Sequence, residues 1–175
     1  MAALWPTEGR CFASRDKKLD NRTFAVNLSA GPVKEIFPYL RVKGAAEAIE
    51  FYKAVFGAFE VFRLTESSGR IGHVQLQLGN TVLQVSEEYP EYGLLGPQDG
   101  PSGCAFHLHV HNVDELAAMA VAAGATMLRQ PSDQFYGERA CMIRDPFGHE
   151  WILGHVIERV TPDEMQSRLT AVTTY

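Results

Sequence analysis

Cysteine is scarce in this sequence, and Cys11, Cys104 and Cys141 lie far apart along the chain. They form no CxxC pair, so the spacing of a zinc knuckle or a redox motif is missing, and three residues make no disulfide framework. This usage is typical of a reducing compartment. None of the three has a neighbour that would activate a thiolate, which argues against nucleophilic catalysis by cysteine.

Long apolar runs and an excess of basic residues are also missing. In the first thirty residues, charged side chains such as Arg10, Arg15 and Asp16 interrupt every apolar stretch, so we expect neither a signal peptide nor a membrane span. Acidic and basic residues are interleaved, with a net charge of −5. Because there is no basic face, nucleic acid and membranes are not expected partners, and the expected location is the cytoplasm.

What the sequence does contain is the composition of a globular domain. Of its 175 residues, 46% are apolar and 21% are charged, which suits one domain or two small units that share a core. We expect three parts: an N-terminal arm (1–34), a folded body (35–158), and a C-terminal helix and tail (159–175). The body divides into halves at 35–87 and 104–158, joined by a linker at 88–103.

Residue periodicity predicts the same order of elements, β-α-β-β-β, in both halves. In the first half the elements are expected at 37–42, 45–56, 59–64, 73–78 and 81–86. In the second half they are expected at 105–110, 113–123, 126–129, 139–144 and 150–153. The sequence Asp145-Pro146-Phe147-Gly148 suits a type I turn before the last strand. Thr161 and Pro162 are typical of a helix start, and this helix is expected to run to about residue 169.

The two halves also match residue by residue. Overlaying them aligns four pairs: Val42 with Val110, Glu47 with Glu115, Phe51 with Met119, and Ala54 with Ala122. Such self-similarity indicates a diverged internal duplication; the alternative is two similar α+β units that arose by chance. We therefore expect an α+β fold in which two tandem βαβββ units form a curved mixed sheet around a central cup.

Several short motifs carry a resemblance to a known family: Leu40-Arg41-Val42, Glu50-Phe51-Tyr52-Lys53, Phe56-Gly57-Ala58 and Asp145-Pro146-Phe147-Gly148-His149. With the duplication, they resemble the vicinal-oxygen-chelate superfamily of glyoxalase I, extradiol dioxygenases, and fosfomycin- and bleomycin-resistance proteins. The resemblance covers residues 36 to about 158, and Gly137-Glu138-Arg139 points to its PhnB-like branch. It implies the glyoxalase/bleomycin resistance fold and a homodimer that binds a small-molecule ligand. The fold by itself does not determine a reaction.

The metal-ligand positions of this superfamily are occupied here by residues that mostly cannot bind a metal. The resemblance places the four positions at Phe37, Gln84, Ala105 and Ile152. A zinc, iron or manganese centre needs at least two strong nitrogen or oxygen donors, and a single amide is a poor ligand. Glyoxalase I and extradiol dioxygenase activities are therefore not expected, and no cofactor is predicted.

Strand alternation indicates which side chains face the cup, because successive residues of a strand point to opposite faces. Val74, Leu76, Phe106 and Leu108 should pack beneath the helices. The predicted ligand-binding residues are Phe37, Tyr39, Arg41, His73, Gln75, Gln84, His107, His109, Glu150 and Trp151. Trp151 is expected either in the core or in the wall of the cup. A lining rich in imidazole and amide groups suits an organic ligand with several hydrogen-bonding groups.

The run His107-x-His109-x-His111 has three interpretations. Residues on one strand face lie roughly 7 Å apart, so two imidazoles can converge on one ion; a relocated divalent-metal site would then use His107, His109 and Glu150. Alternatively, the histidines contact an organic ligand, or they are hydrogen-bonded residues on a solvated strand face. Without a metal, an imidazole beside Glu150 would be suited to acid/base catalysis.

Two functions follow from these patterns, and whether the protein is an enzyme stays open at this point. The first is a metal-free protein that binds a small polar or amphipathic organic molecule in its cup, as the resemblance to bleomycin-resistance proteins implies. The second is a lyase or transferase that uses relocated metal ligands or metal-free acid/base catalysis. A third, an interaction module, is supported by no specific motif.

Overall fold

The computed structural model describes residues 32–98 and 103–173. The expected N-terminal arm therefore lies almost wholly outside the described residues, as does the stretch 99–102 of the linker. Residues 32–35 form no helix or strand. All helices and strands of the described residues lie in one compact unit, Ile36–Tyr175.

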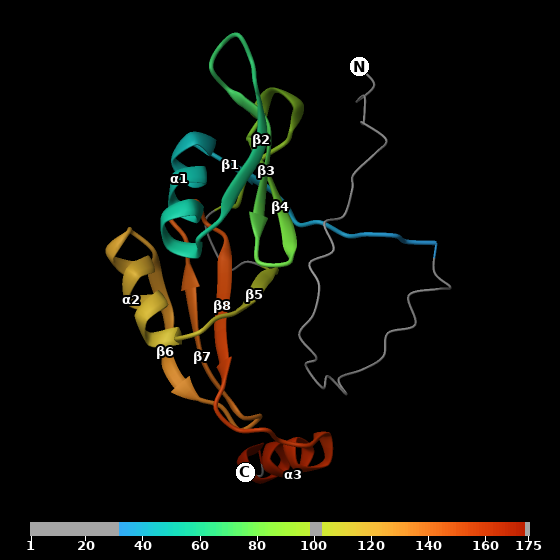
Figure 1. The fold of residues 1–175 in the computed structure, drawn as a ribbon, viewed down its shortest axis with the longest axis vertical. Helices are drawn as coiled ribbons and strands as arrows, with labels where there is room; N and C mark the ends of the chain where they lie inside the picture. The colour runs from blue at the N-terminus through green and yellow to red at the C-terminus, as the bar shows by residue number, and fades with distance from the viewer. Residues whose placement is uncertain (1–31, 99–102, 174–175) are drawn as a thin grey trace, which may run out of the picture. The chain divides into compact units, whose positions relative to one another are not determined.

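Each half of this unit forms βαβββ with its own four-stranded sheet (Figure 1). The first half consists of β1 (Tyr39–Val42), α1 (Ala45–Phe56), β2 (Phe59–Thr65), β3 (Ile71–Leu78) and β4 (Thr81–Glu87). The second consists of β5 (Ala105–His109), α2 (Val113–Ala122), β6 (Thr126–Asp133), β7 (Glu138–Arg144) and β8 (Glu150–Val156). The sheet orders correspond, β1-β4-β3-β2 and β5-β8-β7-β6. The predicted tandem α+β organisation is confirmed, with the strands divided between two sheets.

Two further helical segments flank the second half. A short 3-10 helix, η1 (Pro90–Tyr92), lies in the linker, and α3 (Pro162–Thr173) follows β8. The Thr161 hydroxyl accepts a hydrogen bond from the Glu164 amide at 3.3 Å, which is the cap that the sequence predicted. No helix of the described residues is long and apolar enough to cross a membrane.

Strand boundaries differ from the predicted ones near proline and glycine. β1 begins at Tyr39 rather than at 37, because Pro38 has no amide hydrogen to donate to a ladder. β6 continues through Pro131 to Asp133; it is an edge strand with a shifted register there, so the missing amide costs no ladder bond. β8 continues past Leu153, because Gly154 keeps its place in the ladder.

One face of each sheet is covered by a helix. α1 and α2 lie on the same side of the strands and contact each other (Figure 1). Val74 and Leu76 are fully buried, and Phe106 and Leu108 pack against the same core, as the alternation predicted. The opposite face of the strands, here called the cup face, carries Tyr39, Arg41, His73, Gln75, Gln84, His107, His109, Glu138, Glu150 and Ile152.

Asp145, in the turn between β7 and β8, joins the two halves. Its carboxylate accepts hydrogen bonds from the Tyr52 hydroxyl of α1 at 2.8 Å and from the Trp151 indole of β8 at 2.9 Å. The Phe56 ring of α1 lies 4.8 Å from that of Trp151, centroid to centroid. The predicted turn forms, with the Gly148 amide donating to the Asp145 carbonyl. Residues from three of the motifs noted in the sequence therefore meet at this joint.

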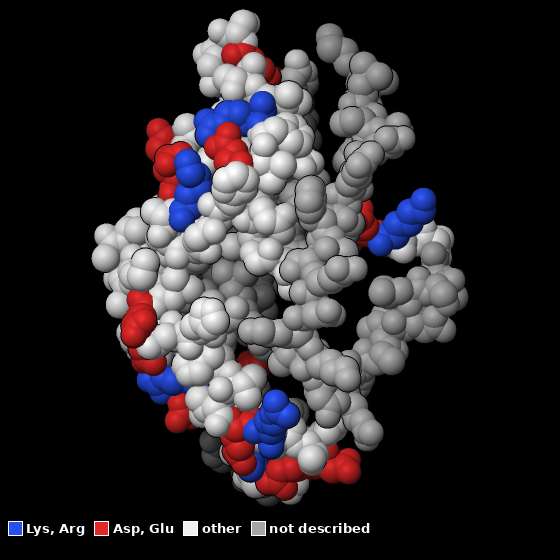
Figure 2. Space-filling view, in the orientation of Figure 1, with Lys and Arg blue, Asp and Glu red and all other residues white. Residues whose placement is uncertain are grey.

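Charged side chains on the visible face occur in mixed groups rather than in a patch of one sign (Figure 2). Many charged residues of the described part of the chain form ion pairs, among them Arg63–Glu60 and Arg139–Asp114. Exposed pairs of this kind contribute little to stability. The visible surface offers no basic face for a polyanion.

Candidate functional site

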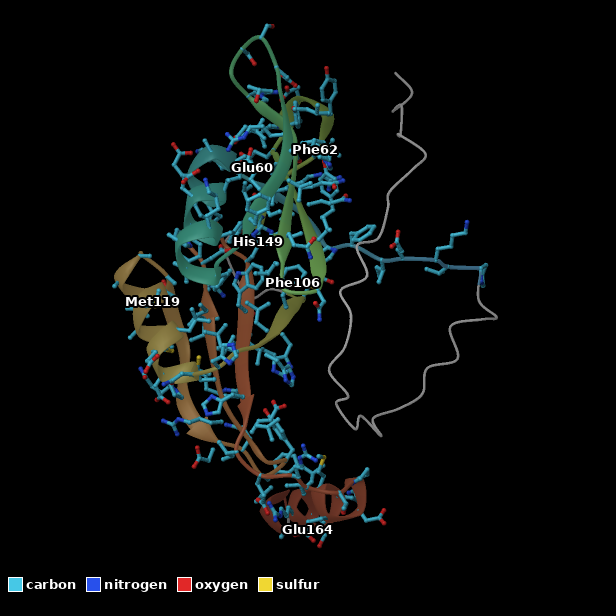
Figure 3. The ribbon with its side chains drawn as sticks, viewed as in Figure 1. Glu60, Phe62, Phe106, Met119, His149 and Glu164 are labelled. Carbon is cyan, nitrogen blue, oxygen red and sulfur yellow. The ribbon has the colours of Figure 1, made fainter. Side chains whose placement is uncertain are left out.

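A cleft of about 900 Å³ lies between the two halves. The first half contributes the end of α1 and the β3–β4 turn, and the second half contributes β5, α2 and Trp151. Its apolar lining consists of Phe56, Leu78, Leu83, Phe106, Leu108, Val110, Leu116 and Met119; its polar lining includes Asn80, His107, His109, His111, Asn112 and Glu115. Figure 3 labels Phe106, near the joint, and Met119, on α2.

The cleft is both apolar and polar because residues from both faces of β5 line it. β5 is the edge strand of its sheet and pairs only with β8. Phe106 and Leu108 point to the helix side, while His107 and His109 point to the cup face. One strand therefore supplies the apolar wall and the row of imidazoles.

The structure brings the carboxylate of Glu138, in β7, against the two histidines of β5. Its Oε2 lies 3.7 Å from His107 Nε2, and its Oε1 lies 3.6 Å from His109 Nε2. The two imidazole rings are 4.8 Å apart, centroid to centroid. Partial burial and the nearby His109 lower the pKa of His107, against the opposing effect of Glu138, so the neutral ring is favoured.

Gly154 of β8 makes this approach across the sheet possible. It lies between His109 of β5 and Ala140 of β7 in the strand pairing. A Cβ atom at Gly154 would lie 2.6 Å from His107 Nε2 and 3.0 Å from Glu138 Oε2. Because Gly154 has no side chain, the His107 imidazole and the Glu138 carboxylate can approach each other there.

Glu150, which the sequence placed with these histidines, is held elsewhere on the cup face. Its buried carboxylate accepts a hydrogen bond from the Arg144 guanidinium at 2.6 Å. It pairs in register with Ala105, two residues before His107 on β5. The carboxylate that lies against both imidazoles is that of Glu138.

The predicted residues of the first half form a second group on the cup face. Tyr39 Oη lies 3.3 Å from His73 Nδ1, and the Phe62 ring packs 5.6 Å from that of His73. Burial lowers the pKa of His73. Arg41 lies over the Tyr39 ring at 6.0 Å. These residues do not line the cleft, so the structure divides the predicted set between two places.

The other predicted residues lie at separate points. Gln75 and Gln84 are cross-strand partners, and Gln84 is buried. Phe37 precedes β1 and is half-buried. Trp151 lies in the core, where its ring packs 5.0 Å from that of Phe106, and it also borders the cleft.

Two residues of the histidine group were missed in the sequence, Glu138 and Gly154. The strand predicted at 139–144 leaves Glu138 in a loop, and the strand predicted at 150–153 ends before Gly154. Counting outward from the β7–β8 turn pairs Ala140 with Gly154 and places Glu138 on the cup face. The sequence alone allows this pairing to be found, but only if the residue pairs of the hairpin are counted from the turn to its open end.

Comparison with known proteins identifies the family of this chain. The model of the glyoxalase/bleomycin resistance protein/dioxygenase superfamily matches residues 33–153. An uncharacterised protein of Mycobacterium tuberculosis is 31% identical over 153 residues, which covers 85% of this chain and 88% of the relative.

Solved structures show the same fold. TioX from Micromonospora is 25% identical with a TM-score of 0.55, covering 69% of this chain and 97% of that one. An Arabidopsis thaliana gene product is 27% identical with a TM-score of 0.58, covering 68% and 96%. The PhnB protein of Bacillus cereus, at 15% identity and a TM-score of 0.57, covers 70% and 99% and shares the fold. With its duplicated βαβββ halves and the cleft between them, this chain belongs to the glyoxalase/bleomycin resistance protein/dioxygenase superfamily.

Proposed function

We propose that this protein binds a small amphipathic organic molecule in the cleft between its halves. The cleft itself carries the proposal: at about 900 Å³ it falls within the range of small-molecule sites. The family description, which includes bleomycin resistance proteins, is consistent with a binding role. The proposal requires no cofactor.

The lining indicates the chemical class of the ligand. Phe106, Leu108 and Met119 form an apolar wall that suits an aromatic or aliphatic body. His107, His109 and Asn112 provide donors and acceptors for carbonyl, hydroxyl or amide groups. A ligand with both kinds of surface matches this arrangement better than a sugar or a purely apolar molecule.

A second candidate function is acid/base catalysis on the bound molecule. The observation that favours it is the neutral His107 beside the Glu138 carboxylate, at the edge of the cleft. An imidazole close to a carboxylate suits proton transfer near neutral pH. We also propose that the protein is a cytoplasmic homodimer. Light scattering at micromolar concentration tests whether it is a dimer.

A thermal-shift screen with metabolites and antibiotics tests the binding proposal. A ligand at about 100 times its Kd stabilises the protein by about 2.7 kcal/mol, so a hit raises the melting temperature. Met119→Glu replaces a half-exposed side chain of the apolar wall with a charged one, and it should abolish the shift in melting temperature. Val121→Glu on the same helix, exposed to a similar degree but outside the cleft lining, is the matched control. If no compound shifts the melting temperature, or if both variants keep the shift, the cleft is not the site.

A further inference from the structure

His107, His109 and Glu138 present three metal-binding atoms to one small space. One ligand atom from each residue lies within 4.8 Å of the others. Around a tetrahedral zinc ion with bonds of about 2.1 Å, ligand atoms are roughly 3.4 Å apart. The distance from His107 Nε2 to Oε2, 3.7 Å, and that from His109 Nε2 to Oε1, 3.6 Å, exceed this value by a few tenths of an ångström. Side-chain rotations that close the remaining separations, none longer than 4.8 Å, would bring one atom of each residue to bonding distance.

Hydrogen bonding does not explain this arrangement. Distances of 3.6 and 3.7 Å are too long for N–H···O hydrogen bonds. Glu138 Oε2 is buried and has no hydrogen-bond partner among the described residues. An unpaired buried carboxylate oxygen is costly, and a bound cation would compensate for it.

The strands of the second sheet hold the three side chains in position. All of them project from strands, β5 and β7, on either side of β8. Gly154 of β8 leaves open the space between them, where any larger side chain would meet His107 and Glu138. Sites on paired strands hold their side chains more rigidly than sites on loops.

We propose that His107, His109 and Glu138 form a binding site for one divalent transition-metal ion of the zinc class. Two imidazoles and one carboxylate are a ligand set that zinc accepts, with a further coordination position left for water or a bound molecule. These residues differ from Phe37, Gln84, Ala105 and Ile152, which occupy the positions that the superfamily resemblance assigned to metal ligands. The site needs no organic ligand, so it stands independently of the binding proposal.

Calorimetric titration of the chelator-treated full chain with Zn²⁺ at pH 7.5 tests the site. We expect one Zn²⁺ per chain, with affinity reduced at least about tenfold in His107→Ala, His109→Ala and Glu138→Gln. His107 and His109 are exposed and Glu138→Gln keeps the side-chain shape, so these variants should fold. His111→Ala, next in the same histidine row, and Cys104→Ser, which removes an exposed thiol, are the controls and should bind like the wild type.

Gly154→Ala tests the geometry without removing a ligand. The backbone of Gly154 is not in the left-handed region, so alanine is tolerated there, but its methyl group occupies the space between His107 and Glu138. We expect normal circular dichroism and Zn²⁺ affinity reduced at least about tenfold. The proposal is overturned if the wild type does not bind Zn²⁺ at micromolar concentration, if Glu138→Gln or Gly154→Ala binds it unchanged, or if His111→Ala loses it equally. Met119→Glu should leave Zn²⁺ binding intact, which separates this result from that of the ligand screen.

Discussion

At the scale of single residues, Asp145 is the most heavily hydrogen-bonded side chain of the joint. Its carboxylate accepts from the Tyr52 hydroxyl, the Trp151 indole, and the backbone amides of Phe147 and His149, at 2.8 to 2.9 Å. A buried charge is stable only while such donors compensate for its lost hydration. Burial, and then the charge of Asp145, raise the pKa of Tyr52 well above its usual value, so the phenol remains a donor.

We expect Asp145→Asn to lower the free energy of unfolding by about 3 kcal/mol, because the side-chain amide replaces one acceptor oxygen with an NH2 donor that faces buried donors. Tyr52→Phe removes a single bond and should cost about 1 to 2 kcal/mol. Urea denaturation followed by circular dichroism measures both values. An Asp145→Asn protein as stable as the wild type would show that the joint does not depend on this carboxylate.

At the scale of elements, the β6–β7 turn holds the chain that leaves β8. The Gly137 carbonyl accepts hydrogen bonds from the amides of Ile157 and Glu158 at 2.9 and 3.0 Å. Gly137 has φ +89°, and an added Cβ would press on the Glu158 carbonyl and lie 2.7 Å from Val160 Cγ2. The start of β7, where Glu138 lies, is thereby fixed against the end of β8.

Gly137→Ala should destabilise the protein by about 2 to 3 kcal/mol, because both the backbone conformation and the space are unfavourable for a side chain. The matched control is Gly69→Ala, with φ +88° but no atom within 4 Å of the added Cβ. Its cost should be only the conformational one, about 1 kcal/mol. Thermal unfolding of the two variants side by side gives the comparison, and equal losses would contradict the packing role of Gly137.

At the scale of the whole molecule, partly buried histidines in both halves make stability depend on pH. Burial lowers the pKa of His73 in the first half and of His149 in the second, where Asp145 opposes the effect. The unfolded chain binds protons at these residues near pH 6.5, whereas the folded chain does so only at lower pH. Their contribution to stability is therefore complete above about pH 6.5 and is lost as the pH falls below it.

We expect urea denaturation in EDTA to give a lower free energy of unfolding at pH 5.5 than at pH 7.5. Carboxylates with lowered pKa, such as Glu60, lose their stabilising contribution only as the pH falls below about 4.5, so the change between pH 7.5 and 5.5 comes from the histidines. His149→Gln should reduce the difference, because the His149 side chain is only 12% exposed. A difference that His149→Gln leaves unchanged would exclude it as the source.

Local sequence patterns determined most of the secondary structure and the tandem organisation of this protein. The helices of both halves, the strand faces of His107 and His109, and the turn at Asp145 depend on spacing within a few residues, which the sequence displays directly. The exact starts and ends of β1, β6 and β8 did not follow, because proline and glycine there are tolerated only through their neighbours in the sheet.

Only the tertiary structure decided which residues act together. Glu138 lies 31 positions after His107 in the numbering, and the two meet because β8 separates their strands and Gly154 leaves the space between them open. Likewise, Tyr52 and Asp145 meet through the packing of one half on the other. Sequence periodicity reports the face on which a side chain lies, whereas strand order and register determine its partners across the sheet.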